Sequence, residues 1–130
     1  MWRYLVIYFK DAGDSTELTP WLRSYVQSTP ELTWFRTPEG ALAALTRLVD
    51  EQERVEVTWG TGCAVIVLHE DMHVGECLTL AGVYSSGNSY KNLRELMRIM
   101  RRVAQALNVP VISYAKRLDT GVYQTKYVRL

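Results

Sequence analysis

The feature that most constrains the fold of this chain is an amphipathic segment between two strand-like segments in its second half. Ser89 is in position to cap a helix there, Asn108 fits the residue after its end, and Pro110 stops it. The apolar residues of the segment recur at helical spacing: Leu93, Leu96, Met97, Met100, Val103, Ala104 and Leu107. Residues 76–84 and 109–114 flank it and are typical of strands. Because a helix connects them, we expect these two strands to be parallel neighbours in one sheet.

The first half predicts one strand and two helices. Residues 2–9 are β-branched and aromatic and are followed by turn residues, which indicates a strand. Thr19-Pro20 and Thr37-Pro38 each combine an N-cap with a first-turn proline, so we expect a helix to begin at each. The apolar faces of these helices are Trp21, Leu22, Tyr25 and Val26 in the first, and Ala41, Leu42, Leu45, Leu48 and Val49 in the second.

A meander and a final strand complete the pattern. Residues 55–59, 63–68 and 76–84 read as three strands joined by tight turns. After the strand at 109–114, a polar turn through Asp119-Thr120-Gly121 leads into the last strand at 122–129. The predicted order is β-α-α-β-β-β-α-β-β, an α/β (α+β) fold with a mixed central sheet, in a single domain of residues 1–130.

Composition and charge exclude several classes of protein. Apolar residues make up 48% of the 130 residues, as in globular domains, and no apolar run approaches the roughly 18 residues of a membrane span. The start of the chain lacks the pattern of a signal peptide, so we expect a cytoplasmic protein without a membrane partner. Residues 1–65 carry six Lys/Arg against nine Asp/Glu, and residues 66–130 carry nine against five. An anionic ligand is therefore expected to bind the second half.

The two cysteines and two histidines do not predict a metal site. Cys63, His69, His73 and Cys77 could form a zinc site on paper, but their spacing fits no familiar finger. We expect two small core cysteines and two histidines in a hairpin, with no metal ligands.

The order of elements resembles the GNAT superfamily of N-acetyltransferases over essentially the whole chain. In that family the fourth strand diverges from its neighbour, and the loop after it binds the pyrophosphate of coenzyme A. The matching cofactor-binding residues are Val83, Tyr84, Ser85, Ser86, Gly87, Asn88, Ser89, Tyr90, Lys91 and Asn92. The family's Gln/Arg-x-x-Gly-x-Gly/Ala pattern meets Lys91 and Leu93 where glycines belong, so the resemblance is one of architecture. It implies acetyl-CoA, or another acyl-CoA, as the cofactor.

The resemblance also implies catalytic and substrate-binding residues. Transfer to an amine needs a base, for which Glu76 at the start of the fourth strand is the candidate, and an acid for the leaving thiolate. Tyr123 and Tyr127 are the candidate acids, and we favour Tyr123. The two are four residues apart in a strand, which places them on the same face. Trp34 and Phe35 follow the first helix and are the candidate substrate-binding residues. In each case a structural or solvated role is the alternative.

Two functions follow from the resemblance. The first is an N-acetyltransferase that acts on an amine of a small molecule or a protein. The second is a catalytically silent GNAT-like protein, of the compact kind found in bacteriophages, that binds a host protein or a second copy of itself. The basic stripe of Lys91, Arg94, Arg98 and Arg101 is a solvated face, a contact for cofactor phosphates, or a nucleic-acid surface. The last is disfavoured because no exposed aromatic residues are interleaved with it.

Overall fold

The computed structural model describes residues 6–85 and 90–130, with the backbone alone for Ser85 and residues 90–93. The elements run in the predicted order, with two 3₁₀ helices added, which confirms the fold class. Their bounds are β1 Val6–Lys10, η1 Thr16–Leu18, α1 Thr19–Ser28, η2 Pro30–Thr33, α2 Pro38–Asp50, β2 Arg54–Trp59, β3 Gly62–Asp71, β4 Gly75–Ser85, α3 Tyr90–Ala106, β5 Val111–Asp119 and β6 Val122–Arg129. The predicted first strand began at residue 2, and residues 1–5 lie outside the described ranges.

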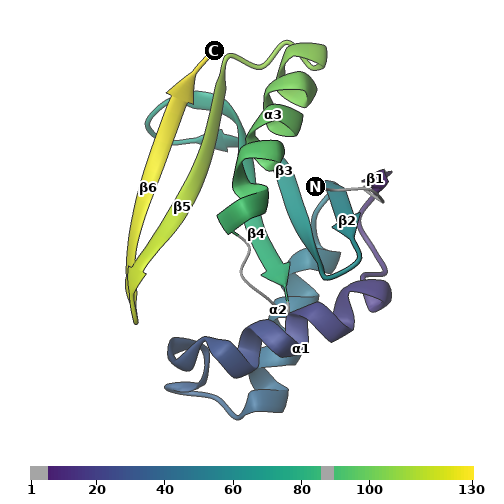
Figure 1. The fold of residues 1–130 in the computed structure, drawn as a ribbon, viewed down its shortest axis with the longest axis vertical. Helices are drawn as coiled ribbons and strands as arrows, with labels where there is room; N and C mark the ends of the chain where they lie inside the picture. Colours follow the sequence, from purple (N-terminus) through teal and green to yellow (C-terminus); the bar gives the residue numbers. More distant parts are fainter. Residues whose placement is uncertain (1–5, 86–89) are drawn as a thin grey trace.

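The strands form one six-stranded sheet in chain order, β1-β2-β3-β4-β5-β6. Every neighbouring pair is antiparallel except β4 and β5, which are parallel and joined through α3 (Figure 1). The predicted parallel pairing of these two strands is therefore confirmed. It follows from the crossover helix, because a strand that leaves the sheet through a helix returns in the same direction.

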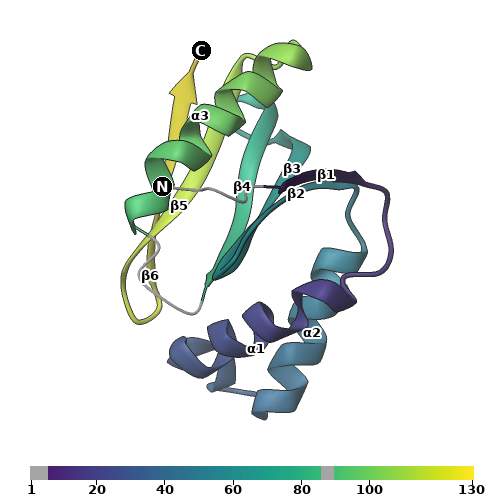
Figure 2. The ribbon, with the colours of Figure 1, turned by 45° about the vertical axis from the view of Figure 1, so that its right-hand side comes forward.

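Helices cover both faces of the sheet. The helix α3 packs on one face, where its buried Leu96, Ile99 and Met100 meet Ile66 and Leu78 of the central strands. The helices α1 and α2 pack on the other face, at the end of the sheet that carries Cys63, Val65 and Tyr84 (Figure 2). They leave the opposite end of that face, towards the β3–β4 hairpin, for polar side chains.

Of the four predicted helix caps, two are confirmed, one is wrong and one lies outside the described residues. Thr37 caps α2, since its hydroxyl accepts a hydrogen bond from the Gly40 N–H at 3.1 Å. Asn108 ends α3 in the left-handed conformation at φ +57°, and the Val109 N–H donates to the Ala104 carbonyl at 2.8 Å. The predicted cap at Thr19 is wrong: η1 leads directly into α1, so Thr19 is already helical and Leu18 holds the cap position. The predicted cap Ser89 lies outside the described residues.

Three other expectations need correction. The strand predicted at 109–114 runs from Val111 to Asp119, because β5 pairs with β6 along nearly its whole length. Leu48 and Leu107 were expected in buried faces but are 54% and 45% exposed. Leu48 lies near the C-terminal end of α2, and Leu107 follows the last residue of α3.

Candidate functional site

The main opening in the structure lies where β4 and β5 separate. The two strands pair at three positions only, Leu78–Ile112, Thr79–Ser113 and Leu80–Tyr114. Beyond them β4 runs on to Ser85 and β5 to Asp119 without further pairing between the two. A cavity of about 430 Å³ occupies this divergence, which we call the β4–β5 cleft. The described residues that line it are Tyr25, Leu80, Ala81, Gly82, Val83, Leu96, Tyr114, Ala115, Lys116, Arg117, Tyr123 and Lys126.

A bulge in β4 marks the point of divergence. Across the β3–β4 ladder Ile66 faces Leu80 and Val65 faces Gly82, which leaves Ala81 as an extra residue. A bulge bends its strand and increases the local twist, so β4 turns away immediately after its last pair with β5. Gly82 is required here, because a Cβ at this position would stand 2.3 Å from the Tyr84 hydroxyl oxygen. The backbone of β4 therefore borders the cleft without a side chain at this position.

The lining of the cleft combines an apolar floor with a basic rim. Leu80, Val83 and Leu96 belong to or pack against the core beneath α3 and form the floor. Lys116, Arg117 and Lys126 come from the β5–β6 hairpin. Among the described lining residues there is no Asp or Glu, so the cleft suits a ligand that is apolar at one end and anionic at the other.

Glu31 ties the β5–β6 hairpin to the segment between α1 and α2. Its carboxylate accepts hydrogen bonds from Arg117 Nε and Nη2, both at 3.0 Å, from the Gly121 N–H at 2.8 Å and from the Tyr123 hydroxyl at 2.8 Å. The paired Arg117 guanidinium holds the pKa of Glu31 well below its usual range, and the Gly121 and Tyr123 donors act in the same direction. Arg117 is thus neutralised, and Lys116 and Lys126 remain the cations of the rim.

The hydrogen bond to Glu31 also affects the protonation of the Tyr123 phenol. Burial and the hydrogen bond to Glu31 raise the pKa of its phenol to about 12. The phenol is therefore neutral at physiological pH, borders the cleft, and has its proton directed at a carboxylate. Tyr25 of α1 also lines this side of the cleft and stacks edge-on against Tyr84, with ring centroids 5.0 Å apart.

Trp34 packs against the turn of the β5–β6 hairpin. Gly121 turns the chain at φ +73°, and a Cβ there would stand 2.6 Å from Trp34 Cη2. The indole therefore lies against the turn between β5 and β6, although 57% of Trp34 is exposed. Phe35 beside it is 95% exposed.

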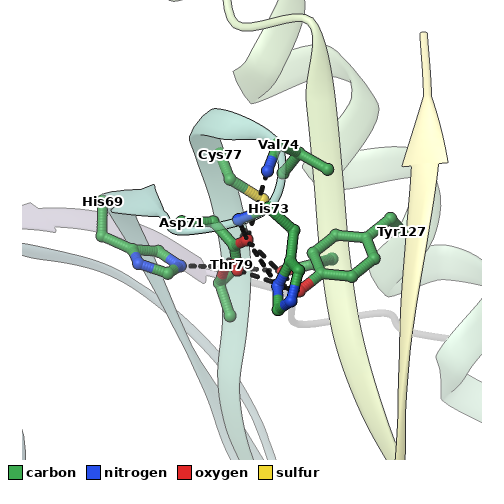
Figure 3. A network of polar contacts seen from close by, with 8 residues as sticks. His69, Asp71, His73, Val74, Cys77, Thr79 and Tyr127 are labelled. Carbon is green, nitrogen blue, oxygen red and sulfur yellow. Dashed lines mark hydrogen bonds and ion pairs between the residues drawn. The ribbon is translucent and has the colours of Figure 1, made fainter.

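A second group of polar side chains lies on the face of the sheet that α1 and α2 cover, at the end that these helices leave uncovered. Figure 3 shows this group. His69 Nε2 is 2.6 Å from Thr79 Oγ1, and Thr79 Oγ1 is 2.7 Å from Ser113 Oγ. Ser113 is buried, Thr79 is half-buried and His69 is exposed, so these three form a continuous chain from the sheet interior to solvent. Cys77 is buried beside them, with its sulfur 3.7 Å from Thr79 Oγ1.

Asp71 and Tyr127 form the outer part of this group. The Tyr127 hydroxyl donates to Asp71 Oδ2 at 3.0 Å, and the His73 N–H donates to Asp71 Oδ1 at 2.7 Å. The His73 N–H and the Tyr127 hydroxyl hold the pKa of Asp71 below its ordinary value. Burial, together with the bond to Asp71, raises the pKa of Tyr127. These contacts link β6 to the β3–β4 hairpin.

Comparison with known proteins supports the architecture. No protein-family model matches the sequence, and no curated protein matches it. In structure, the chain is similar to a protein of Desulfovibrio desulfuricans assigned as an acetyltransferase of the GNAT family. The TM-score is 0.52, with 16% sequence identity, over 86% of this chain and 73% of that chain. The fold is GNAT-like. At this identity the similarity concerns the fold, and the activity has to be argued from the cleft.

The GNAT-like fold places the sequence-predicted cofactor residues at the cleft only in part. Val83 lines the cleft, whereas Tyr84 is buried against α1, and burial raises the pKa of its phenol. Ser86, Gly87, Asn88 and Ser89 lie outside the described residues, as do the side chains of Ser85, Tyr90, Lys91 and Asn92. The prediction that these residues bind the cofactor stays untested.

The candidate catalytic residues are separated by the structure. Tyr123 borders the cleft, whereas Tyr127 contacts Asp71 at the far end of the same face. Glu76 is exposed near the start of β4, pairs with Glu70 across the ladder, and is not among the residues lining the cleft. The candidate substrate residues Trp34 and Phe35 lie beside the β5–β6 turn rather than in the lining.

Sequence reasoning missed the residues that shape the rim. Glu31 and Arg117 are 86 positions apart and meet only in the folded chain. No local pattern marks Glu31, which sits in a short 3₁₀ helix after Pro30. The excess of basic residues in the second half was the one signal that pointed towards Lys116 and Lys126.

Within residues 6–85 and 90–130, no three His, Cys, Asp or Glu side chains are arranged to hold a metal ion. In those same ranges no helix combines the length and apolar character needed to cross a bilayer.

Proposed function

We propose that this protein binds an acyl-CoA in the β4–β5 cleft and transfers its acyl group to an amine. The observation that carries the proposal is the divergence of two parallel strands after three paired positions, with a cavity of about 430 Å³ between them. Such a gap leaves backbone N–H and C=O groups of one strand without their usual partners on the next. A ligand that inserts there and replaces the missing strand satisfies them.

The pantetheine arm of coenzyme A has the chemistry that this gap requires. It is a narrow chain with two amide groups, so it can pair with the β4 backbone beyond Leu80 as an added strand would. Gly82 makes room for the Tyr84 phenol on one side of this strand, and the edge of β4 towards β5 has no strand partner beyond Leu80. The acyl group at the end of the arm would lie against the apolar floor of Leu80 and Leu96.

The phosphates would lie at the basic end of the cleft. Lys116 and Lys126 line it, and α3 begins at Tyr90, a few residues after β4 ends. The first N–H groups of a helix have no partner within the helix and bind anions. Lys91, in the first turn of α3, would add a positive charge there, as the sequence predicts.

Tyr123 is the residue best placed to act on the leaving thiolate. Its phenol borders the cleft and is neutral, with a pKa of about 12, so it carries a proton at any pH at which the reaction would run. To donate to a sulfur in the cleft, the hydroxyl has to turn away from Glu31. Glu31 would then still hold the hairpin through Arg117 and the Gly121 N–H.

The binding step can be tested by filling the cleft. Ala81 is exposed at its border, so Ala81→Trp should occupy the opening without disturbing a buried side chain. We expect acetyl-CoA affinity, measured by calorimetry, to fall by at least about tenfold, or about 1.4 kcal/mol. Ala43→Trp, at an exposed position on α2, is the matched control and should bind as the parent does. Equal affinity of Ala81→Trp and the parent would place the ligand elsewhere.

A second function, binding of a protein partner without catalysis, is favoured by two observations. The proton of Tyr123 is held by Glu31, and no described lining residue of the cleft is a carboxylate base. Trp34, which lies against the β5–β6 turn, and its neighbour Phe35 also expose apolar rings, as a protein-binding surface would. The two functions separate in an assay of thiol release from acetyl-CoA with amine substrates. Coenzyme A binding without thiol release would favour the second.

A further inference from the structure

We infer that His69, Thr79 and Ser113 form a proton relay that deprotonates the acceptor amine at the closed end of the cleft. The inference rests on the proposed function, since it supplies the base that the lining of the cleft lacks. Its basis is a chain of two short contacts. His69 Nε2 lies 2.6 Å from Thr79 Oγ1 (Figure 3), and Thr79 Oγ1 lies 2.7 Å from Ser113 Oγ. Both are within the range in which hydroxyl protons are shared.

Ser113, the buried end of the relay, lies close to the point where β4 and β5 separate, which is the apex of the cleft. Thr79 and Ser113 are paired across β4 and β5, one position before the last pair, Leu80–Tyr114. Leu80 and Tyr114 line the cleft, and so does Ala115, the next residue after Ser113 on the same face of β5. Neither hydroxyl belongs to the described residues that line the cleft, so the acceptor ammonium has to pass the small side chain of Ala115 to reach Ser113 Oγ.

The direction of proton transfer follows from which group donates each hydrogen bond, because each hydroxyl has one proton to donate. A threonine hydroxyl donates one hydrogen bond, and Thr79 has His69 at 2.6 Å and the Cys77 sulfur at 3.7 Å as acceptors. The shorter contact takes the proton when His69 Nε2 is unprotonated. Thr79 then accepts from Ser113, so that Ser113 keeps a lone pair for a donor in the cleft. In this arrangement each group is ready to move a proton outward.

The step balances as follows. An ammonium in the cleft gives one proton to Ser113 Oγ, the Ser113 proton passes to Thr79, and the Thr79 proton passes to His69 Nε2. The resulting free amine attacks the thioester carbon: a C–N bond forms and the C–S bond breaks. Tyr123 gives its proton to the thiolate and takes up the second proton that the nitrogen loses. His69 is exposed, so its imidazolium returns the first proton to water. Ser113 would be the catalytic residue of the relay, and Thr79 and His69 would act through it.

Few other titratable groups on this face of the sheet could take the proton from Thr79 in place of His69. Asp71 and His73 follow His69 in the β3–β4 hairpin, Cys77 is paired with His69 across the ladder, and Tyr127 comes from β6. Asp71 is occupied by the Tyr127 hydroxyl and the His73 N–H. Of the two histidines, only His69 contacts Thr79 in the described structure.

The test compares His69→Gln with His73→Gln. Both histidines are exposed and lie in the same hairpin, so neither change should affect folding, which melting temperatures can check. Turnover would be measured as thiol release from acetyl-CoA with spermidine and a lysine-containing peptide as acceptors. We expect His69→Gln to lower kcat about 10²-fold, as for loss of a general base, with parental acetyl-CoA affinity. His73→Gln should turn over like the parent.

A pH series distinguishes a relay from a structural effect. Near the ordinary amine pKa of about 10, the acceptor is already deprotonated and needs no relay, so the defect of His69→Gln should shrink as pH rises. Thr79→Val should show the same rescue, and Thr58→Val, a half-buried threonine of β2, should show no defect.

The relay is overturned if His69→Gln and Thr79→Val keep parental kcat, or if their defects do not depend on pH. It is also overturned if the parent binds acetyl-CoA but acetylates neither acceptor. Failure to bind acetyl-CoA at all would instead refute the proposed function, and calorimetry reports that outcome separately.

Discussion

Replacement of Gly121 by alanine tests whether the β5–β6 hairpin is fixed by local backbone conformation and by Trp34. Gly121 adopts φ +73°, where a residue with a Cβ loses about 1–2 kcal/mol. The new Cβ would also meet Trp34 Cη2 at 2.6 Å, well inside van der Waals contact. Trp34 is 57% exposed and its ring can shift, so we assign at most about 1 kcal/mol to this contact. The free energy of unfolding should fall by about 1–3 kcal/mol in total.

Three other variants divide this loss into its parts. Gly13→Ala carries a positive φ of +133° but has nothing within 4 Å of its Cβ, so it reports the conformational cost alone. Gly60→Ala has open space and no positive φ, and should leave stability within about 1 kcal/mol of the parent. In the Trp34→Ala background, Gly121→Ala should cost less than in the parent by the amount of the steric contact.

Thermal unfolding followed by circular dichroism measures these differences. For a chain of this size about 1 kcal/mol corresponds to a change of roughly 3–6 °C in Tm. If Gly121→Ala unfolds within about 1 °C of the parent, the hairpin does not depend on this turn. If the loss is the same with and without Trp34, the indole is a neighbour of the turn and does not restrain it.

Two further predictions concern tyrosines of β6 and their carboxylate partners. Tyr123→Phe should lower turnover about 10²–10⁴-fold while acetyl-CoA affinity measured by calorimetry stays near the parental value, and parental turnover would make Tyr123 structural. Because the pKa of Asp71 is lowered in the folded protein, its contribution to stability is present above the ordinary pKa of 3.8 and is lost as pH falls below it. Urea unfolding of the parent at pH 7 and pH 3 should show this loss, and Asp71→Asn should reduce the difference; an unchanged difference would exclude Asp71 as its source.

The sequence supported the topology because the decisive signals are local. The amphipathic face of α3 and the strand-like segments on either side of it are enough to require a parallel crossover between β4 and β5. Thr37 and Asn108 act within one turn of their own helices, so their roles could be predicted from neighbouring residues. The predicted strand at 109–114 ended too early because residues 115–119 are exposed and three of them are charged, and only pairing with β6 makes them a strand.

The site depended on contacts that no local pattern contains. Glu31 binds Arg117 and Tyr123 across 86 and 92 positions, and Ser113 meets Thr79 across 34. Alternation correctly placed Tyr123 and Tyr127 on one face, but it could not show that they serve opposite ends of it. The bulge at Ala81 gave no signal either, because alanine is an ordinary residue for a strand interior.

The bulge in β4 has an evolutionary consequence. Leu80 faces Ile66 and Gly82 faces Val65, which are the partners that an uninterrupted strand would give to two successive residues. Ala81 is therefore an insertion that leaves its neighbours on the faces they would occupy without it. A chain that lost this single codon would keep both cores and the order of its strands, yet β4 could continue alongside β5 and leave no room for a ligand. In this architecture, the gain or loss of a binding cleft lies one in-frame deletion away.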